Sequence, residues 1–298
     1  MQEAKDYIKN LAILIPIFMI VTIGFNWLMN PYGIYDSPEI EGLNKLKPEF
    51  STHLRIAKAW TVYKQKPDGI ILGSSRSEIL NPNHAGWRSQ LVYNLALPGC
   101  ILYEALRYFQ HAHAIKPQKQ VVLAIDFLMF NVFKPNSLDI KREAHLFVNY
   151  DGHINSQLLS EKFLTLVSID AFIGSIKTLI MQEIILIEKL YLPNGQMHWD
   201  APYKHIHHQG GGHRRSFQSN ENHYVNSVWI FPPRNQYRFV DPKTGQSTFN
   251  YFRTFLNTAY RDNIDLRILT SPSHARLWEA LYFVGLWPKF EQWKREIV

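Results

Sequence analysis

The sequence has one cysteine, Cys100, among its 298 residues, and a single cysteine excludes an intrachain disulfide. We interpret Cys100 as a packing residue. Neither an internal repeat nor a low-complexity tract is present. By contrast, 46% of the residues are hydrophobic and 14% aromatic, so the chain has enough apolar material for a sizeable core.

Clusters of positive charge are also lacking. The formal net charge is +7, but the lysines and arginines are scattered along the chain. A nucleic-acid-binding surface usually needs them gathered on one face, so we predict no nucleic-acid partner. A basic surface facing an anionic membrane or a wall polymer explains the charge equally well.

Residues 11–29 contain no charged side chain. At about 1.5 Å per residue, such a helix reaches roughly the hydrocarbon thickness of a bilayer. Lys5 and Lys9 precede the run, and Trp27, Tyr32 and Tyr35 lie where aromatic rings favour the membrane interface. The next basic residues follow only at positions 45 and 47, which gives a small positive-inside bias. We therefore predict that residues 1–30 are a single-pass membrane anchor, with the N-terminus inside and the C-terminal domain outside.

Two other interpretations of this segment are weaker. A cleaved signal peptide would have a shorter apolar region, and no small-x-small cleavage site precedes Asn30-Pro31. A buried core helix rarely has so long an uncharged run at the extreme N-terminus.

Downstream of a connector at 31–66, which leads into a helix at 54–65, strand-like and helical patterns alternate. Short apolar runs at 69–72, 91–95, 121–125 and 265–269 predict strands, and residues 101–115 show helical spacing. This alternation predicts an α/β domain over 67–298 with a parallel sheet.

Residues 134–249 interrupt the pattern, and we expect an insertion over the sheet edge. Its first part, 158–192, has long apolar faces typical of helices, and its second part is polar and rich in histidine and glycine. Towards the C-terminus, residues 277–286 and 287–296 are also expected to be helical.

Three blocks follow the first three predicted strands. Gly73-Ser74-Ser75 follows the first, the second runs into Asn94 and on to Pro98-Gly99, and the third ends in Asp126. Together they resemble the SGNH/GDSL hydrolase superfamily, and in particular its membrane-anchored branch, with the D-alanyl-lipoteichoic acid and alginate O-acetylation proteins. The resemblance covers about 70–128 and 266–272, and it implies a three-layer, flavodoxin-like sheet.

The resemblance also implies roles for individual residues. Ser75 falls at the position of the nucleophile, and Ser74 stands where the family usually has aspartate. The alternative is that this turn only caps a helix. Gly99 matches the glycine whose amide joins that of the nucleophile in the oxyanion hole, although a plain helix-start turn is equally compatible. Ser74, Arg76 and Asn94 are expected near the substrate, and Asn94 is also expected to brace the loop.

At the third block the chain departs from the family, which has an asparagine after a glycine. Here Asp126 occupies the place, and an ionised carboxylate cannot donate to an oxyanion. We expect Asp126 to be a hydrogen-bonding strut at the oxyanion site, and Asn131 is a weak substitute.

The catalytic base is the largest departure. The family uses Asp-x-x-His near its C-terminus, and this motif occurs nowhere in the chain. Either His274 serves as the base, or the C-terminal catalytic block is missing and the site is inactive. His274 also fits a loop that enters the helix at 277, where it would line the site.

Six histidines lie within one stretch, but their spacing does not suit a closed zinc site, and no metal or cofactor is predicted. They are His198, His205, His207, His208, His213 and His223. The triple glycine 210–212 predicts a flexible lid over Ser75, and Arg214 and Arg215 are candidates for binding an anionic glycan or phosphate.

These observations lead to an expected function. The resemblance implies acyl-ester transfer or hydrolysis on a cell-envelope polysaccharide or polymer by a protein of the bacterial inner membrane, with a membrane acyltransferase as a candidate partner. The alternatives are a catalytically silent envelope binding or assembly protein with the same fold and, more weakly, an anchored protein that faces the cytoplasm.

Overall fold

A computed structural model describes residues 2–134, 146–149, 153–154, 157–183, 190–200, 203, 211–229 and 237–298. Its centre is a four-stranded parallel sheet in the order β2-β1-β3-β4. The strands are β1 (Gly69–Leu72), β2 (Val92–Asn94), β3 (Gln120–Ile125) and β4 (Asp265–Thr270). The predicted parallel α/β sheet is confirmed, and each strand lies within a residue or two of its predicted position.

Helices α2 (Leu54–Gln65), α3 (Leu102–Ile115) and α8 (Thr248–Arg261) accompany the sheet. Helix α3 packs on β1 and also contacts α2 and α8, and α8 contacts β4. Strands β1 and β3 are buried along almost their whole length, and apart from Gln120 at the start of β3 they contain no polar side chain, as is usual for a parallel sheet. Strands β2 and β4 are the edge strands, and most of the side chains of β4 are exposed.

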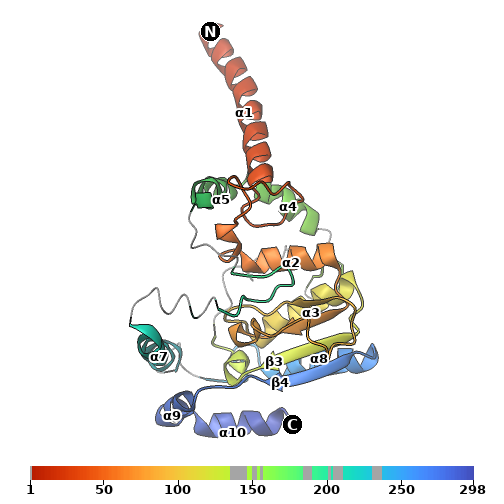
Figure 1. Ribbon diagram of the computed structural model, residues 1–298, viewed down its shortest axis with the longest axis vertical. Helices are drawn as coiled ribbons and strands as arrows, with labels where there is room; N and C mark the ends of the chain where they lie inside the picture. The colour runs from red at the N-terminus through yellow and green to blue at the C-terminus, as the bar shows by residue number, and fades with distance from the viewer. Residues whose placement is uncertain are drawn as a thin grey trace.

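The C-terminal helices are α9 (Ala275–Phe283) and α10 (Trp287–Glu296), and they lie on the side of the sheet remote from α1 (Figure 1). Phe290 and Trp293 of α10 pack on Phe127, and Trp293 also contacts Phe130. These two phenylalanines belong to η3 (Phe127–Phe130), the 3₁₀ turn after β3. The C-terminal helices are therefore joined to the carboxyl end of β3 through aromatic packing.

Helix α1 (Gln2–Met29) extends away from the rest of the protein (Figure 1). It is long and apolar enough to cross a membrane, and its side chains are exposed from position 4 to Val21. Helices α4 (Gln157–Val167) and α5 (Ile169–Ile180) contact α1 near its C-terminal end. The described helices in the first part of the insertion thus pack on α1, whereas the sequence predicts an insertion over the sheet edge.

The helical prediction for 158–192 is confirmed over α4 and α5 and is wrong at its C-terminal end. After the 3₁₀ turn η6 (Met181–Glu183), residues 190–192 are not helical, because Tyr191 forms an antiparallel bridge with Met197. In the polar second part, where the sequence predicts a flexible lid, the described residues from Gly212 to His223 form helix α7, which continues into the π-helical turn η7 (Tyr224–Trp229). Gly211 is the N-cap of α7, and Gly210 lies outside the described residues.

Candidate functional site

The Gly-Ser-Ser turn leaves β1 very close to β3. Gly73 has φ +149°, and a Cβ atom there would lie 2.6 Å from the carbonyl oxygen of Ala124. Glycine is therefore required for the chain to turn at this point. Ser74 follows in extended conformation, and its carbonyl accepts hydrogen bonds from the amide and the hydroxyl of Ser77, which close the 3₁₀ turn η2 (Ser75–Ser77).

Ser74 and Asp126 connect the ends of β1 and β3. The Ser74 hydroxyl donates to Asp126 Oδ2 over 2.7 Å, and both residues are buried. Asp126 Oδ1 accepts from the Met129 amide at 3.2 Å, so this carboxylate also caps η3. In both contacts Asp126 accepts, as a strut would. The Ser74 hydroxyl is buried and bonded to Asp126, so it has a structural role and not the substrate contact expected for it.

Ser75 is placed differently. It is exposed, and its hydroxyl has no hydrogen-bond partner within the described part of the chain. The turn that carries it lies between β1 and β3, where the strand order reverses, and open α/β sheets bind their ligands at this point. The two adjacent serines therefore have separate environments, one structural and one open to a substrate.

Arg76 links this turn to the loop after β4. Its guanidinium donates to the Ser273 hydroxyl over 2.7 Å. A narrow cleft is lined here by Arg76, Asp126 and Ser273, together with apolar side chains of α9 and Trp293 of α10. The ends of β1, β3 and β4 thus meet at one site.

The second block lies beside the same turn. The Leu97 amide donates to the Gly73 carbonyl at 3.0 Å, which places the Pro98-Gly99 turn next to Gly-Ser-Ser. Gly99 is exposed and has φ +65°. Arg55 steadies this turn, because its guanidinium donates to the Pro98 carbonyl at 2.9 Å and pairs with the buried Glu104 at 2.6 Å.

Asn94 is fully buried and braces the chain beyond the site. Its amide nitrogen lies within 3.1 Å of the carbonyl oxygens of Ser77, Glu78 and Leu80, and its own oxygen accepts from the Ala96 amide. Of the two roles expected for Asn94, the structure shows the brace, since a wholly buried side chain with these partners does not face a ligand.

His274 is exposed and is the N-cap of α9. Its Nδ1 accepts from the Arg276 amide at 3.3 Å, and its ring contacts that of Phe217 in α7, with centroids 4.8 Å apart. An accepting Nδ1 leaves the proton of a neutral ring on Nε2. No carboxylate among the described residues hydrogen-bonds to His274, so the orienting partner of a catalytic triad is missing there.

Helix α7 carries Arg214 and Arg215, and both are exposed. The helix packs beside α9 through Phe217 and through an ion pair between Glu221 and Arg276, in which one contact is 2.8 Å (Figure 1). This part of the expected lid is thus a helix attached to the same loop region as His274.

The histidine-rich stretch is described only in part. His205, His207 and His208 lie outside the described residues, and His198 pairs with Asp200. In the part of the chain that the structure describes, no group of three histidine, cysteine or acidic side chains could hold a metal ion.

Lys134 is a site residue that the sequence did not indicate. Its ammonium donates to the Cys100 carbonyl at 3.3 Å, directly after Gly99. Burial lowers the pKa of Lys134, and the nearby Asp126 carboxylate opposes this shift. Lys134 therefore brings positive charge to the strand ends where an oxyanion would form. An isolated lysine before a proline has no pattern that would reveal such a role.

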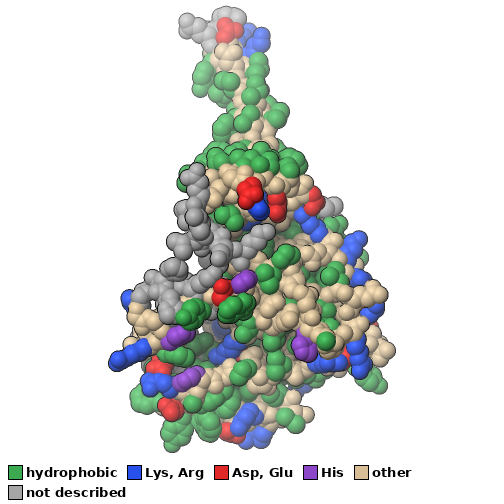
Figure 2. Space-filling view, in the orientation of Figure 1, with side chains coloured by type: hydrophobic (Ala, Val, Ile, Leu, Met, Phe, Trp, Pro, Cys, Tyr) green, Lys and Arg blue, Asp and Glu red, His purple; other side chains and the backbone are tan. Residues whose placement is uncertain are grey.

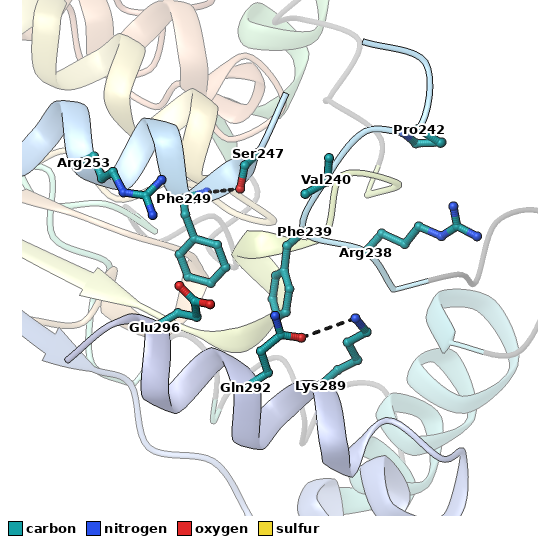
Figure 3. A pocket seen from close by; sticks show the side chains of 10 residues that line it. All are labelled: Arg238, Phe239, Val240, Pro242, Ser247, Phe249, Arg253, Lys289, Gln292 and Glu296. Carbon is teal, nitrogen blue, oxygen red and sulfur yellow. Dashed lines mark hydrogen bonds between the residues drawn. The ribbon is translucent and has the colours of Figure 1, made fainter. Parts of the chain in front are cut away.

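A separate cavity of about 440 Å³ lies between α10, the start of α8 and the segment before it (Figure 3). Arg238, Arg253 and Lys289 line it, together with Glu296 and the ring of Phe239. None of its lining residues belongs to the Gly-Ser-Ser site.

Comparisons with protein-family models, with curated proteins and with solved structures gave no match. The candidate site therefore has to be judged on its own geometry.

Proposed function

We propose that this chain is a membrane-anchored, SGNH-like protein with a three-layer α/β domain that takes part in acyl-ester transfer or hydrolysis on a cell-envelope polysaccharide or polymer. The observation that carries the proposal is the exposed Ser75 hydroxyl, which has no partner among the described residues and lies where the strand order reverses, with the Gly99 turn beside it. The order β2-β1-β3-β4 is also that of the first four strands in flavodoxin-like folds.

In the proposed reaction, Ser75 Oγ attacks the acyl carbonyl carbon while a base takes the hydroxyl proton. The backbone amides of Ser75 and Gly99 donate to the oxyanion, and the Lys134 charge adds to its stabilisation. The alcohol of the ester leaves with the proton, and the acyl group on Ser75 passes to water or to an acceptor hydroxyl. The base that the sequence suggests is His274. Arg76, Arg214 and Arg215 are candidates for holding an anionic polymer.

A second function is a catalytically silent binding or assembly protein with the same fold. The cap that His274 forms on α9 favours it, because the Nδ1 contact leaves Nε2 protonated and unable to accept the serine proton. The ring would have to change its tautomer or its orientation to act as a base.

For the location we propose the bacterial inner membrane, with α1 as a single span, its N-terminus inside and the α/β domain outside. The support is Lys5 and Lys9 before the apolar run, together with the length of α1. The proposed partners are the lipid bilayer, an acylated envelope polymer and a membrane acyltransferase that would supply or receive the acyl group.

A serine-directed fluorophosphonate probe tests the enzyme proposal on the full chain in detergent. We expect labelling of the wild type and its loss in Ser75→Ala. Because Ser75 is exposed, the free energy of unfolding of that variant should lie within about 0.5 kcal/mol of the wild-type value. Ser74→Ala is the matched control. It should keep the label but lose about 1–3 kcal/mol of stability, since Asp126 loses a buried donor.

The outcomes separate the two functions. Labelling that persists in Ser75→Ala would exclude Ser75 as the nucleophile. No labelling of a folded wild type would favour the silent binding protein.

A further inference from the structure

Helices α4 and α5 have an outward face that is strongly apolar. The two helices meet at Ser168 with a bend of 65° and lie crosswise at the C-terminal end of α1 (Figure 1). In Figure 2 hydrophobic side chains form a belt at this level. The side chains on the outward face are between 37% and 77% exposed, and they are Phe163, Leu164, Ile169, Ile173, Ile176, Leu179 and Ile180.

The inward face of the pair is small and polar, and it is attached to α1. The Asn26 amide of α1 donates to the Leu166 carbonyl at 2.8 Å, and its oxygen accepts from the Ser175 hydroxyl at 2.9 Å. Phe25 packs edge-on against Phe172, with centroids 5.7 Å apart. These contacts hold α4 and α5 at a fixed level on α1.

Charged side chains of the pair turn towards the rest of the protein. Lys177 pairs with Glu49 of the connector at 3.0 Å, and Asp170 accepts from the Tyr32 hydroxyl at 2.8 Å. The Lys162 ammonium lies over the ring of Trp60 at 4.7 Å. The outward face is thus left apolar, which a water-facing helix pair would rarely show over such an area.

The position along α1 at which α4 and α5 are attached indicates whether lipid or water covers their outward face. The uncharged run of α1 begins at Leu11, and Asn26 lies about 22 Å further along a helix that rises about 1.5 Å per residue. A bilayer core is about 30 Å thick. If Leu11 marks one edge of the core, Asn26 and the helices attached to it lie about 8 Å inside the other. Amphipathic helices in a membrane interface are immersed by about 5–10 Å.

We infer that α4 and α5 lie in the plane of the membrane around the exit of α1, with their outward apolar face in lipid. The inference rests on the proposal that α1 spans the bilayer. In this arrangement α1, α4 and α5 together attach the protein to the membrane. They fix the height and tilt of the α/β domain relative to the membrane surface. Since the strands run crosswise to α1, the carboxyl edge of the sheet with Ser75 would face along the membrane surface (Figure 1).

Variants of the full chain that each carry one added cysteine, labelled with an environment-sensitive fluorophore in phosphatidylcholine–phosphatidylglycerol vesicles, test this inference. The native Cys100 is buried, and burial raises the pKa of its thiol, so it stays unlabelled in the folded protein. Ile173→Cys and Ile180→Cys report on the outward face, and Ile15→Cys reports on α1. Phe283→Cys is the matched control, because Phe283 is an exposed apolar residue of α9 on the far side of the sheet.

Lipids with a nitroxide near the headgroup should quench the labels at 173 and 180, whereas the label at 283 should keep its fluorescence. Lipids with a nitroxide deep in the acyl chain should quench the label at 15. If the label at 15 is quenched while the labels at 173 and 180 behave like the label at 283, water or another protein covers the outward face. The inference is then wrong, although the proposal that α1 is a membrane anchor stands. If 15 is not quenched by either lipid, the proposed anchor fails and the inference fails with it.

Discussion

At the scale of single residues, Lys58, Glu78 and Tyr191 form a buried polar cluster beside the segment that follows the Gly-Ser-Ser turn. The Lys58 ammonium donates to the Ala96 carbonyl at 2.7 Å and lies 5.0 Å from the centre of the Tyr191 ring. The Tyr191 hydroxyl donates to Glu78 at 2.7 Å. The cluster joins α2 to the residues that follow Ser75 and to those that precede Gly99, so both halves of the proposed oxyanion site depend on it.

Burial lowers the pKa of Lys58 to about 8, although the Glu78 carboxylate opposes the shift. In the unfolded chain a lysine has its usual pKa of about 10.4. Between these two values the unfolded state binds more protons than the folded state. The contribution of Lys58 to the free energy of unfolding should therefore rise with pH, by at most about 1.4 kcal/mol per pH unit.

Denaturant unfolding of the full chain in detergent at pH 8, 9 and 10 would measure this effect. We expect the stability difference between the wild type and Lys58→Met to grow over this range in favour of the wild type. Lys243→Met, at an exposed lysine, is the control and should keep the pH slope of the wild type. A difference that stays constant with pH would contradict the prediction.

At the scale of the elements, the strands could be predicted because their signals are local. Ile70, Ile71 and Leu72 form a continuous apolar run bounded by turn residues, as expected for a buried parallel strand. Residues 190–192 were mispredicted as helical, because the structure of the segment 190–197 depends on distant partners. The Asn194 carbonyl accepts from the Asn94 amide, and the Met197 amide donates to the Glu78 carbonyl. Apolar periodicity contains no information about such pairings.

The same distinction applies to the candidate site. Parallel strands place their carboxyl ends at one edge, so the location of Gly-Ser-Ser and Asp126 at the same edge followed from the predicted sheet. The environments of the two serines did not follow, since a shift of one residue exchanges the buried and the exposed hydroxyl. The contact of Arg76 with Ser273 depends on β4 lying beside β3, and strand order cannot be read from strand positions alone.

The turn at 190–197 gives a prediction for an element. Gly195 has φ +79°, and a Cβ atom there would lie 2.3 Å from the Asn94 carbonyl oxygen. Gly195→Ala should therefore push the turn away from the end of β2. Gly245→Ala is the matched control, because Gly245 has φ +71° but, apart from its two chain neighbours, no described residue would have an atom within 4 Å of the added methyl group.

Both variants carry the strain of an alanine at positive φ, so the difference between them isolates the steric contact. We expect Gly195→Ala to be less stable than Gly245→Ala by about 1–3 kcal/mol in chemical denaturation. Equal losses of stability in the two variants would contradict the prediction, because the turn would then have moved without disturbing β2.

At the scale of the whole molecule, α1 leaves from the side occupied by α2, α4 and α5, whereas α9 and α10 lie at the opposite end (Figure 1). The sheet lies between them, so under the proposal that α1 spans the bilayer the candidate site would be held off the membrane by roughly the layer of α2 and α3. The proposed function further requires that the α/β domain and the envelope polymer lie on the same side of the membrane. The orientation of α1 therefore decides between the proposed substrate class and a cytoplasmic one.

Cysteine accessibility in spheroplasts would establish that orientation. We expect a membrane-impermeant maleimide to label Tyr260→Cys, at a position that is 92% exposed in α8, in intact spheroplasts. Tyr7→Cys, at an exposed position before the apolar run, should be labelled only after lysis, because Lys5 and Lys9 stay in place and favour retention inside. The unmodified chain is the control, since its buried Cys100 should not react in either sample. The reverse pattern, with Tyr7→Cys labelled before lysis and Tyr260→Cys only after it, would place the domain in the cytoplasm and exclude an envelope polymer as its substrate.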